Sequence, residues 1–321
     1  MLPYRDEPQR RTRGLPFVTI ALILINIAVF AYELTLSQDA AMRFVRAWAF
    51  VPDEFWAGRN LITLVTALFL HGGVIHIAGN MLFLWIFGDN VEDQLGRGTY
   101  LLFYLAAGIV ASIVFAIVFP VASQPLLGAS GAIAGVLAGY LFLFPRAMVR
   151  TFLFFGPFLA VGRVAAVLLI GFWFVLQLVQ SVVSVIAIAS QSNVAFVAHV
   201  GGFIFGLIVT GVIRESRDLR VEYRGGRRWW SASFRNWILL VAVITGLVVG
   251  SQFLIMSGQA LLGHLLRYLT GLGGVGLALF DGIARFNGQQ GLLGSGRQRN
   301  RLIALFQVGA ALSLAVLLFI S

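Results

Sequence analysis

The chain contains no cysteine and no lysine, and it has few charged residues of any kind. Without cysteine it can form neither a disulfide nor a thiolate metal site. All of its side-chain positive charge therefore comes from arginine, and the formal net charge is +10. Only 11% of the residues are charged whereas 59% are hydrophobic, and the mean hydropathy is +0.91. This composition excludes a soluble domain and predicts several membrane spans.

The arginines lie in short segments between long apolar runs, which is typical of membrane topology and not of a nucleic-acid-binding patch. Arginine-bearing segments are residues 1–14, the loop around Arg97, the connection 146–163 and the stretch after residue 213, whereas loops 120–129 and 183–193 carry no charge. The segment 37–74 departs from this contrast, because it carries arginines that are balanced by acids. Because cytoplasmic loops are enriched in arginine, the N-terminus is expected inside. No targeting peptide is recognised, so we expect a multi-pass protein of a bacterial plasma membrane.

The apolar runs predict an all-α polytopic protein in which a six-helix core is followed by two or three extra transmembrane helices. The predicted core helices are 17–36, 76–87, 101–119, 130–145, 164–182 and 194–213, with the segment 37–74 lying in the headgroup layer. The expected organisation is a disordered cytoplasmic tail at 1–14, the core at 15–213, a basic cytoplasmic linker at 214–236 and a C-terminal extension of unknown role at 237–321.

The stretch 128–140, GASGAIAGVLAGY, places Ser130 where an uncharged loop meets an apolar helix. Glycines recur along it every three or four residues, so a second helix can approach one face to backbone distance. The first turn of a helix also presents free N–H groups and the positive end of the helix dipole, which stabilise developing negative charge. A simple packing helix with an N-cap serine would show the same pattern.

Three further polar side chains interrupt apolar helices, where such residues are costly. His76 and Asn80 lie one turn apart on the same face of the second helix, and His199 lies early in the sixth. Hydrogen bonding between helices for packing is one explanation. Under the predicted topology, however, these residues and Ser130 all fall within roughly 10 Å of the outer ends of their helices. This shared depth favours one polar site.

Serine and histidine together are typical of a nucleophile and its general base, here Ser130 and His199. No Asp or Glu occurs between Asp93 and Glu215, so a dyad is expected rather than a triad. The oxyanion would be stabilised by the Ser130 backbone N–H together with His76 and Asn80.

Metal binding is the competing chemistry for the histidines of the second helix. His71 and His76 are five residues apart and no carboxylate joins them, unlike a helical zinc pair at i and i+4. We therefore expect no metal and no cofactor.

Three motifs, taken together, resemble the rhomboid family of intramembrane serine proteases. They are His71-x4-His76-x3-Asn80, Gly128-Ala-Ser130-Gly131, and Ala198-His199-x-x-Gly202-x-x-x-Gly206. The resemblance implies Ser130 as nucleophile, His199 as base, His76 and Asn80 in the oxyanion hole, and Gly128 in a substrate-facing loop, with His71 and Gly131 as supporting residues. It also implies that segment 37–74 is a membrane-embedded first loop, and that the fifth helix with loop 183–193 forms the substrate gate and cap.

The function expected is therefore endopeptidase cleavage of transmembrane protein substrates within the lipid bilayer, through an acyl-enzyme on Ser130. Two alternative functions predict different sequence features. A catalytically inactive rhomboid-like protein that binds membrane clients would be expected to lack Ser130 or His199, and both are present. A transporter would show inverted repeats and charged residues at mid-membrane, and the sequence has neither.

Overall fold

The computed structural model describes residues 2–6, 14–155, 158–186 and 196–217, with side chains described over most of these ranges. The chain divides into two compact units, and the elements discussed below belong to the first, Met1–Ser181 with Asn193–Val221. Most of the predicted loop 183–193 and linker 214–236, and all of the predicted extension 237–321, lie outside the described residues.

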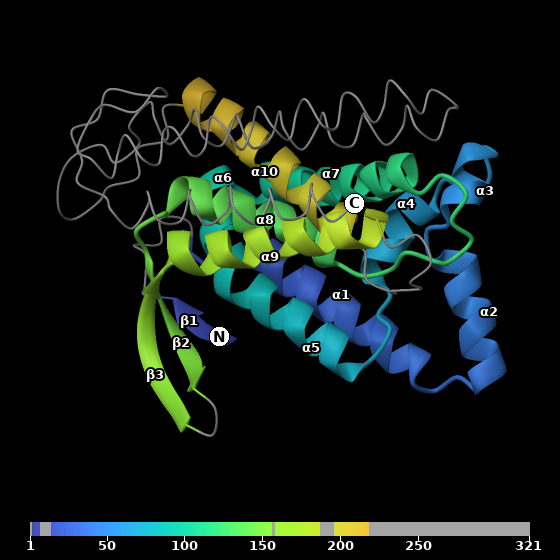
Figure 1. Ribbon diagram of the computed structural model, residues 1–321, viewed down its shortest axis with the longest axis horizontal. Helices are drawn as coiled ribbons and strands as arrows, with labels where there is room; N and C mark the ends of the chain where they lie inside the picture. Colours follow the sequence, from blue (N-terminus) through green and yellow to red (C-terminus); the bar gives the residue numbers. More distant parts are fainter. Residues whose placement is uncertain (1, 7–13, 156–157, 187–195, 218–321) are drawn as a thin grey trace. The chain divides into compact units, whose positions relative to one another are not determined.

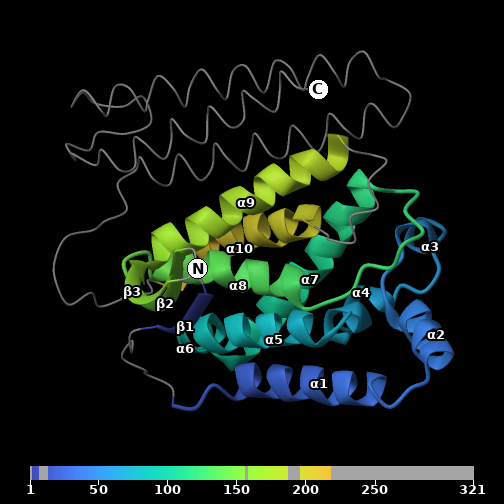
Figure 2. The same ribbon diagram turned by 60° about the horizontal axis from the view of Figure 1, so that its bottom comes forward.

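The described chain is mostly helical, and the prediction of a polytopic helical membrane protein is confirmed at that level (Figures 1 and 2). The long helices are α1 (Phe17–Glu33), α5 (Val74–Phe83) continued through a π-helical turn at Leu84–Gly88 into α6 (Asp89–Leu95), α7 (Arg97–Val118), α8 (Ser130–Leu143), α9 (Ala166–Ile186) and α10 (Phe196–Arg217). Within the described residues, three stretches are long and apolar enough to cross a membrane: Val74–Leu95, Arg97–Val118 and Phe196–Ile213. Six crossings remain a prediction.

The predicted interfacial segment 37–74 folds into short helices at one end of the bundle (Figure 1). They are α2 (Gln38–Trp48), α3 (Pro52–Trp56), α4 (Thr63–Thr66) and a 3-10 turn at Ala67–Phe69. A small buried cluster of Phe50, Ala67 and Ala116 attaches the segment to α7. The indole of Trp56 also donates a hydrogen bond to the Ala116 carbonyl at 3.1 Å.

The opposite end of the bundle carries a three-stranded antiparallel sheet of order β1-β2-β3, which corrects the all-α prediction. Strand β1 (Leu2–Asp6) pairs with β2 (Met148–Phe155), which pairs with β3 (Phe158–Ala165). Residues 2–6 are therefore a strand, not the disordered tail that was expected. The sequence does contain a hairpin signal, since two runs rich in Val, Phe and Thr flank the dipeptide Gly-Pro at 156–157. The arginines of connection 146–163 favoured a cytoplasmic loop instead.

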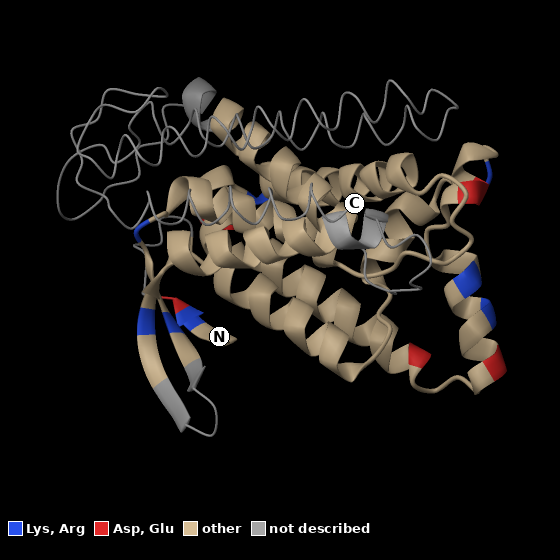
Figure 3. Ribbon diagram, in the orientation of Figure 1, with Lys and Arg blue, Asp and Glu red and all other residues tan. Residues whose placement is uncertain are grey.

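Charged residues gather at the two ends of the helices (Figure 3). At the sheet end, Glu92 receives hydrogen bonds from the backbone N–H groups of Val18 and Thr19 at 3.0 and 2.8 Å, and so satisfies the first turn of α1. Asp6 accepts hydrogen bonds from the Asn90 amide at 2.7 Å and from the Tyr140 hydroxyl at 3.1 Å, which joins β1 to the helices. Burial, together with the nearby Asp89 carboxylate, raises the pKa of Asp6 to about 6.

Asp6 is expected to make stability depend on pH. Its folded pKa of about 6 lies above the ordinary 3.8, so folding favours the protonated form. This contribution is complete below pH 3.8 and is lost as the pH rises through about 6. Asp6→Asn removes the ionisable group, so above pH 6 the variant should be more stable than wild type by on the order of 1 kcal/mol after allowance for solvent screening. Thermal unfolding in detergent at pH 4.5 and 7.5 measures this, and a difference that grows toward acid pH would contradict the assignment.

Candidate active site

Helix α8 is the central element of the site. It has 14 residues, about 21 Å at 1.5 Å per residue, and so is shorter than the roughly 30 Å hydrocarbon core. Nearly all of its residues are buried, and it contacts α7, α10 and the α5–α6 helix. A helix of this length can begin below the membrane surface, and it begins at Ser130. The sequence therefore places a hydroxyl inside the bundle.

The loop that leads to Ser130 has its backbone groups paired by the segment 37–74. Phe50 and Leu126 exchange two backbone hydrogen bonds, of 3.0 and 2.7 Å, and the Gly128 N–H donates to the Ala67 carbonyl at 2.8 Å. Irregular backbone at membrane depth requires such partners, because lipid offers none. The first loop thus holds the entrance to α8 in place.

Glycine allows α8 and α10 to touch through their backbones. A Cβ at Gly202 would overlap the carbonyl oxygen of Gly131, and a Cβ at Gly206 would overlap that of Gly135. On its other side, α8 meets α7, where a Cβ at Gly135 would lie 2.6 Å from the Ala107 methyl. The small-residue spacing in the sequence therefore corresponds to real contacts. Gly131, predicted as a supporting residue, contributes its carbonyl to this contact, and a Cβ on it would lie 2.6 Å from the Ala111 methyl.

This close packing brings Ser130 and His199 together. The Ser130 Oγ lies 2.7 Å from the His199 Nε2, across an interval of 69 residues in the chain. The other ring nitrogen, Nδ1, lies 2.8 Å from the side-chain oxygen of Gln177 on α9. Because an amide oxygen only accepts, the tautomer that satisfies this contact carries its proton on Nδ1 and leaves Nε2 to accept a proton from the serine. Trp173 lies beside the imidazole with its ring centroid 6.0 Å away.

His76, Asn80 and Gly128 lie together next to this pair. A Cβ at Gly128 would meet the His76 ring at 2.9 Å and the Asn80 amide nitrogen at 3.8 Å. Gly128 also has φ +117°, a conformation that side-chain-bearing residues rarely adopt. Glycine is therefore required at this position on two counts. The three residues predicted to form the oxyanion and substrate side of the site do gather there, and their roles remain predictions.

His71 contacts Asn80 rather than the serine. The Asn80 amide nitrogen lies 3.0 Å from the His71 Nε2, and both side chains are buried. His71 precedes α5, and burial, together with the nearby charge of His76, lowers its pKa to about 4. A neutral imidazole therefore holds the Asn80 side chain at neutral pH, which is consistent with the supporting position predicted for His71.

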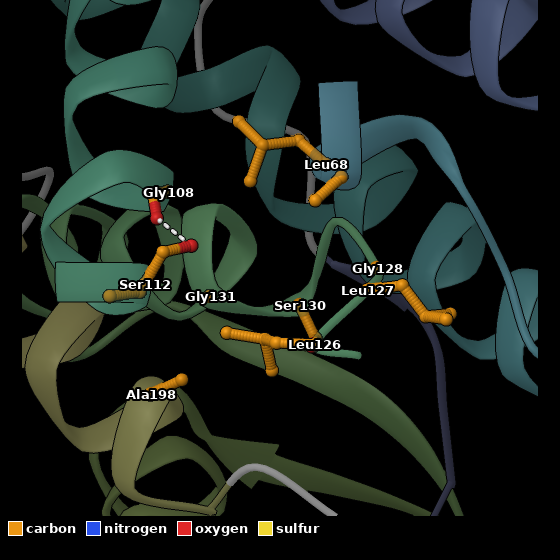
Figure 4. A pocket seen from close by; sticks show the side chains of 11 residues that line it. Leu68, Gly108, Ser112, Leu126, Leu127, Gly128, Ser130, Gly131 and Ala198 are labelled. Atoms are coloured by element: carbon orange, nitrogen blue, oxygen red, sulfur yellow. Dashed lines mark hydrogen bonds between the residues drawn. The ribbon is translucent and has the colours of Figure 1, made fainter. Parts of the chain in front are cut away.

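A small cavity opens beside the serine, with room for about one water molecule at about 20 Å³. Ser130, Gly128 and Gly131 line it together with Leu68 and Ser112, and Figure 4 shows these residues around it. The Ser112 hydroxyl donates to the Gly108 carbonyl of its own helix at 3.1 Å, as the dashed line in Figure 4 marks. Two serines thus line one cavity, and it is Ser130 whose hydroxyl contacts a histidine.

Sequence reasoning missed Gln177. It lies among apolar residues in α9, and its side chain is 8% exposed. A buried amide in a membrane helix is costly and so is a functional signal of the kind used for Asn80. In the described residues, no group of three or more His, Cys, Asp and Glu side chains is arranged to hold a metal ion.

Fold and site together define a multi-pass membrane protein in which a serine at the start of α8 contacts a histidine of α10. A model of the Rhomboid domain matches residues 58–216. The chain belongs to the rhomboid family, which includes intramembrane serine proteases, and the resemblance seen in its motifs is confirmed.

Curated relatives of several origins match the chain. It is 33% identical over 148 residues to the rhomboid protease GluP of Bacillus subtilis (strain 168), covering 44% of this chain and 29% of GluP. It is 26% identical over 218 residues to the mitochondrial Rhomboid protein 1 of Saccharomyces cerevisiae, covering 65% and 58%. It is 30% identical over 152 residues to the mitochondrial presenilin-associated rhomboid-like protein of Bos taurus, covering 45% and 36%. The alignments therefore span less than two thirds of the length of each relative.

Proposed function

We propose that the protein is an intramembrane serine endopeptidase that uses Ser130 and His199 to cleave transmembrane segments. The observation that carries the proposal is the 2.7 Å contact between the Ser130 Oγ and the His199 Nε2. This distance lies within the range over which a general base takes a proton from a nucleophile. The name of one relative, rhomboid protease GluP, adds support.

In the proposed reaction the Ser130 oxygen attacks the scissile carbonyl carbon while its proton passes to the His199 Nε2. The peptide C–N bond then breaks as the imidazolium returns that proton to the leaving amine. Water, deprotonated by the same imidazole, attacks the acyl-enzyme and releases the carboxylic acid product. The cavity beside Ser130 has room for one such water.

The oxyanion of the tetrahedral intermediate would be stabilised by donors from two helices. The first turn of α8 offers N–H groups that have no partner within the helix. His76 and the Asn80 amide approach from the α5 side, and Gly128 leaves space between them. Preorganised donors of this kind in a low-dielectric site contribute several kcal/mol to catalysis.

The substrate proposed is a membrane-spanning helix that unwinds near the outer leaflet, since a helical backbone hides its carbonyl groups from attack. The arginine distribution supports an N-terminus on the cytoplasmic side. A bacterial plasma membrane is proposed, and its support is the relative from Bacillus subtilis. Other relatives carry mitochondrial or chloroplastic names, so the membrane of residence is tested by expression of a tagged chain in each setting.

Cleavage of a reporter transmembrane segment by the purified, reconstituted protein tests this function. Wild type should cut, and Ser130→Ala should fall to background. Ser112→Ala is the matched control, because Ser112 lines the same cavity but donates its hydroxyl proton to the Gly108 carbonyl of its own helix. If wild type binds the reporter without cutting it, the protein is a client-binding relative and the proposal fails.

Gln177 is proposed to hold the imidazole in the productive tautomer, as a positioning residue. Gln177→Leu should lower kcat about 10- to 100-fold because the Nδ1 proton loses its acceptor. Gln177→Glu should move the acid limb of the pH–rate profile to higher pH, since a carboxylate favours the protonated imidazole. Gln180→Leu, at an exposed position on the same helix, is the control and should leave both unchanged. If the pH–rate profile of Gln177→Glu is not shifted, Gln177 serves packing and does not position the imidazole.

A further inference from the structure

His71 contacts both of the side chains that are proposed to stabilise the oxyanion. Its Nε2 lies 3.0 Å from the Asn80 amide nitrogen. Its ring lies edge-on to the ring of His76, with the two centroids 5.1 Å apart. His71 is only 4% exposed, in the short connection between the turn at Ala67–Phe69 and α5. A group that fixes the imidazole of His71 therefore also fixes the two oxyanion donors.

The contact with Asn80 determines where the proton of His71 lies. Because an amide nitrogen only donates, the tautomer that satisfies this contact accepts at Nε2 and carries its proton on Nδ1. The Asn80 amide nitrogen has a second proton, and the same nitrogen would lie 3.8 Å from a Cβ at Gly128. With one amide proton held by His71, the second is available to the space beside Gly128.

The other oxyanion donor is oriented from the same connection. The Gly72 N–H donates to the His76 Nδ1 at 3.4 Å, so the tautomer that satisfies this contact carries its proton on Nε2. A Cβ at Gly128 would meet that Nε2 at 3.0 Å. His71 and Gly72 together thus leave one N–H group of Asn80 and one of His76 to face Gly128.

The Nδ1 of His71 is buried and has no hydrogen-bond partner among the described residues. The Phe69 carbonyl lies near the imidazole, but without the geometry of a hydrogen bond to Nδ1. A buried N–H group that donates to nothing is costly, and buried polar groups in native proteins nearly always have a partner. The Nδ1 proton therefore calls for an acceptor close to His71.

Glu33, the last residue of α1, offers an unused acceptor at this place. α1 lies beside α5 in both views (Figures 1 and 2), and it also contacts the turn that precedes His71. The Glu33 carboxyl lies beside the His71 backbone N–H. Its Oε1 is buried and, like the His71 Nδ1, has no hydrogen-bond partner among the described residues. A donor without an acceptor and an acceptor without a donor thus belong to two neighbouring residues.

We propose that Glu33 is a positioning residue of the oxyanion hole, an inference that rests on the protease function proposed above. Its carboxylate accepts a hydrogen bond from the Nδ1 proton of His71. This bond holds the His71 Nε2 toward Asn80 and keeps the second amide proton of Asn80 directed at the oxyanion. The hydrogen bond at one ring nitrogen sets the tautomer of the imidazole, and so decides what the other nitrogen can do. Glu33 acts through His71 and does not touch the substrate.

Kinetics of reporter cleavage test the role of Glu33. Glu33→Leu removes the acceptor and should lower kcat about tenfold with little change in KM, because an oxyanion donor acts in the transition state. Glu33→Gln keeps an acceptor oxygen and should stay within about threefold of wild type. Glu54→Leu is the matched control and should change neither constant. Glu54 is a partly buried acid of the segment 37–74, and its carboxylate contacts Asn60 at 2.6 Å.

The same substitution in an Asn80→Ala background separates positioning from folding. If Glu33 acts through Asn80, its removal should cost less than about twofold in kcat once the amide is gone. An equal loss in both backgrounds would show that Glu33 acts elsewhere, and would overturn the proposal.

A spectrum of the histidine side chains tests the contact itself and needs no cleavage. The chain has four histidines, so full-length protein with nitrogen-15-labelled histidine in nanodiscs gives few ring signals, and His71→Gln identifies those of His71. Wild type should show a slowly exchanging Nδ1 proton at His71. Glu33→Leu should speed its exchange at least about tenfold, whereas Glu54→Leu should not. Unchanged exchange in Glu33→Leu would assign the proton to the Phe69 carbonyl and overturn the proposal. If wild type cuts no reporter but the exchange responds to Glu33→Leu, the protease function fails and the contact stands.

Discussion

Replacing His199 by alanine is expected to lower kcat/KM for reporter cleavage by at least about 10³-fold, because the serine loses its general base. The 2.7 Å contact between the His199 Nε2 and the Ser130 Oγ is the route proposed for the serine proton. No acid lies between Asp93 and Glu215 in the chain, and Glu92 instead holds the first turn of α1. In the described residues, therefore, no carboxylate lies beside the imidazole to assist it as a general base.

The double variant Ser130→Ala/His199→Ala sharpens this prediction. Residues that act as one unit have strongly non-additive effects, so the double variant should be no slower than either single variant. His199→Gln keeps a polar side chain of similar size and should also be inactive, with a thermal unfolding midpoint close to that of wild type. Independent, multiplying losses at the two positions would show that they do not form a dyad.

The residues of the site could be predicted because each is a polar residue near the outer end of an otherwise apolar helix. A histidine, an asparagine and a serine at one depth in otherwise apolar helices are costly, and that cost marked His76, Asn80, His199 and Ser130. The sequence alone left open which of them touch. The contact between Ser130 and His199 depends on glycines that let the backbones of α8 and α10 meet. A glycine-rich helix face does not reveal from the sequence which helix packs against it.

Gln177 and the sheet were missed for different reasons. The amide of Gln177 is a signal in itself, but Gln180, Ser181 and Ser184 follow it in the same helix, and only the fold shows that it is Gln177 that meets His199, 22 residues later in the chain. Strand β1 has only five residues and pairs with a strand about 145 residues later in the chain. Local sequence carries no signal for such a pairing, because the stabilising contacts are supplied by tertiary structure. The nearby arginines favoured a loop.

Gly206→Ala adds only one methyl group but is expected to lower the stability of the protein strongly. The new methyl group would overlap the backbone carbonyl of Gly135, and a backbone atom in a packed helix cannot turn aside as a side chain can. We expect a loss of about 1–3 kcal/mol in the free energy of unfolding, measured by thermal or denaturant unfolding in detergent. Gly171→Ala on α9 is the matched control, because a Cβ there meets nothing within 4 Å and alanine favours a helix.

The same substitution also tests how the site is positioned. Moving α10 away from α8 at Gly206 shifts His199, which is two turns earlier on the same helix, relative to Ser130. A displacement of about 1 Å is enough to lower the rate about 100-fold, even at a temperature where the variant stays folded. Wild-type kcat in a folded Gly206→Ala protein would show that the backbone contact between the two helices does not set the distance between nucleophile and base.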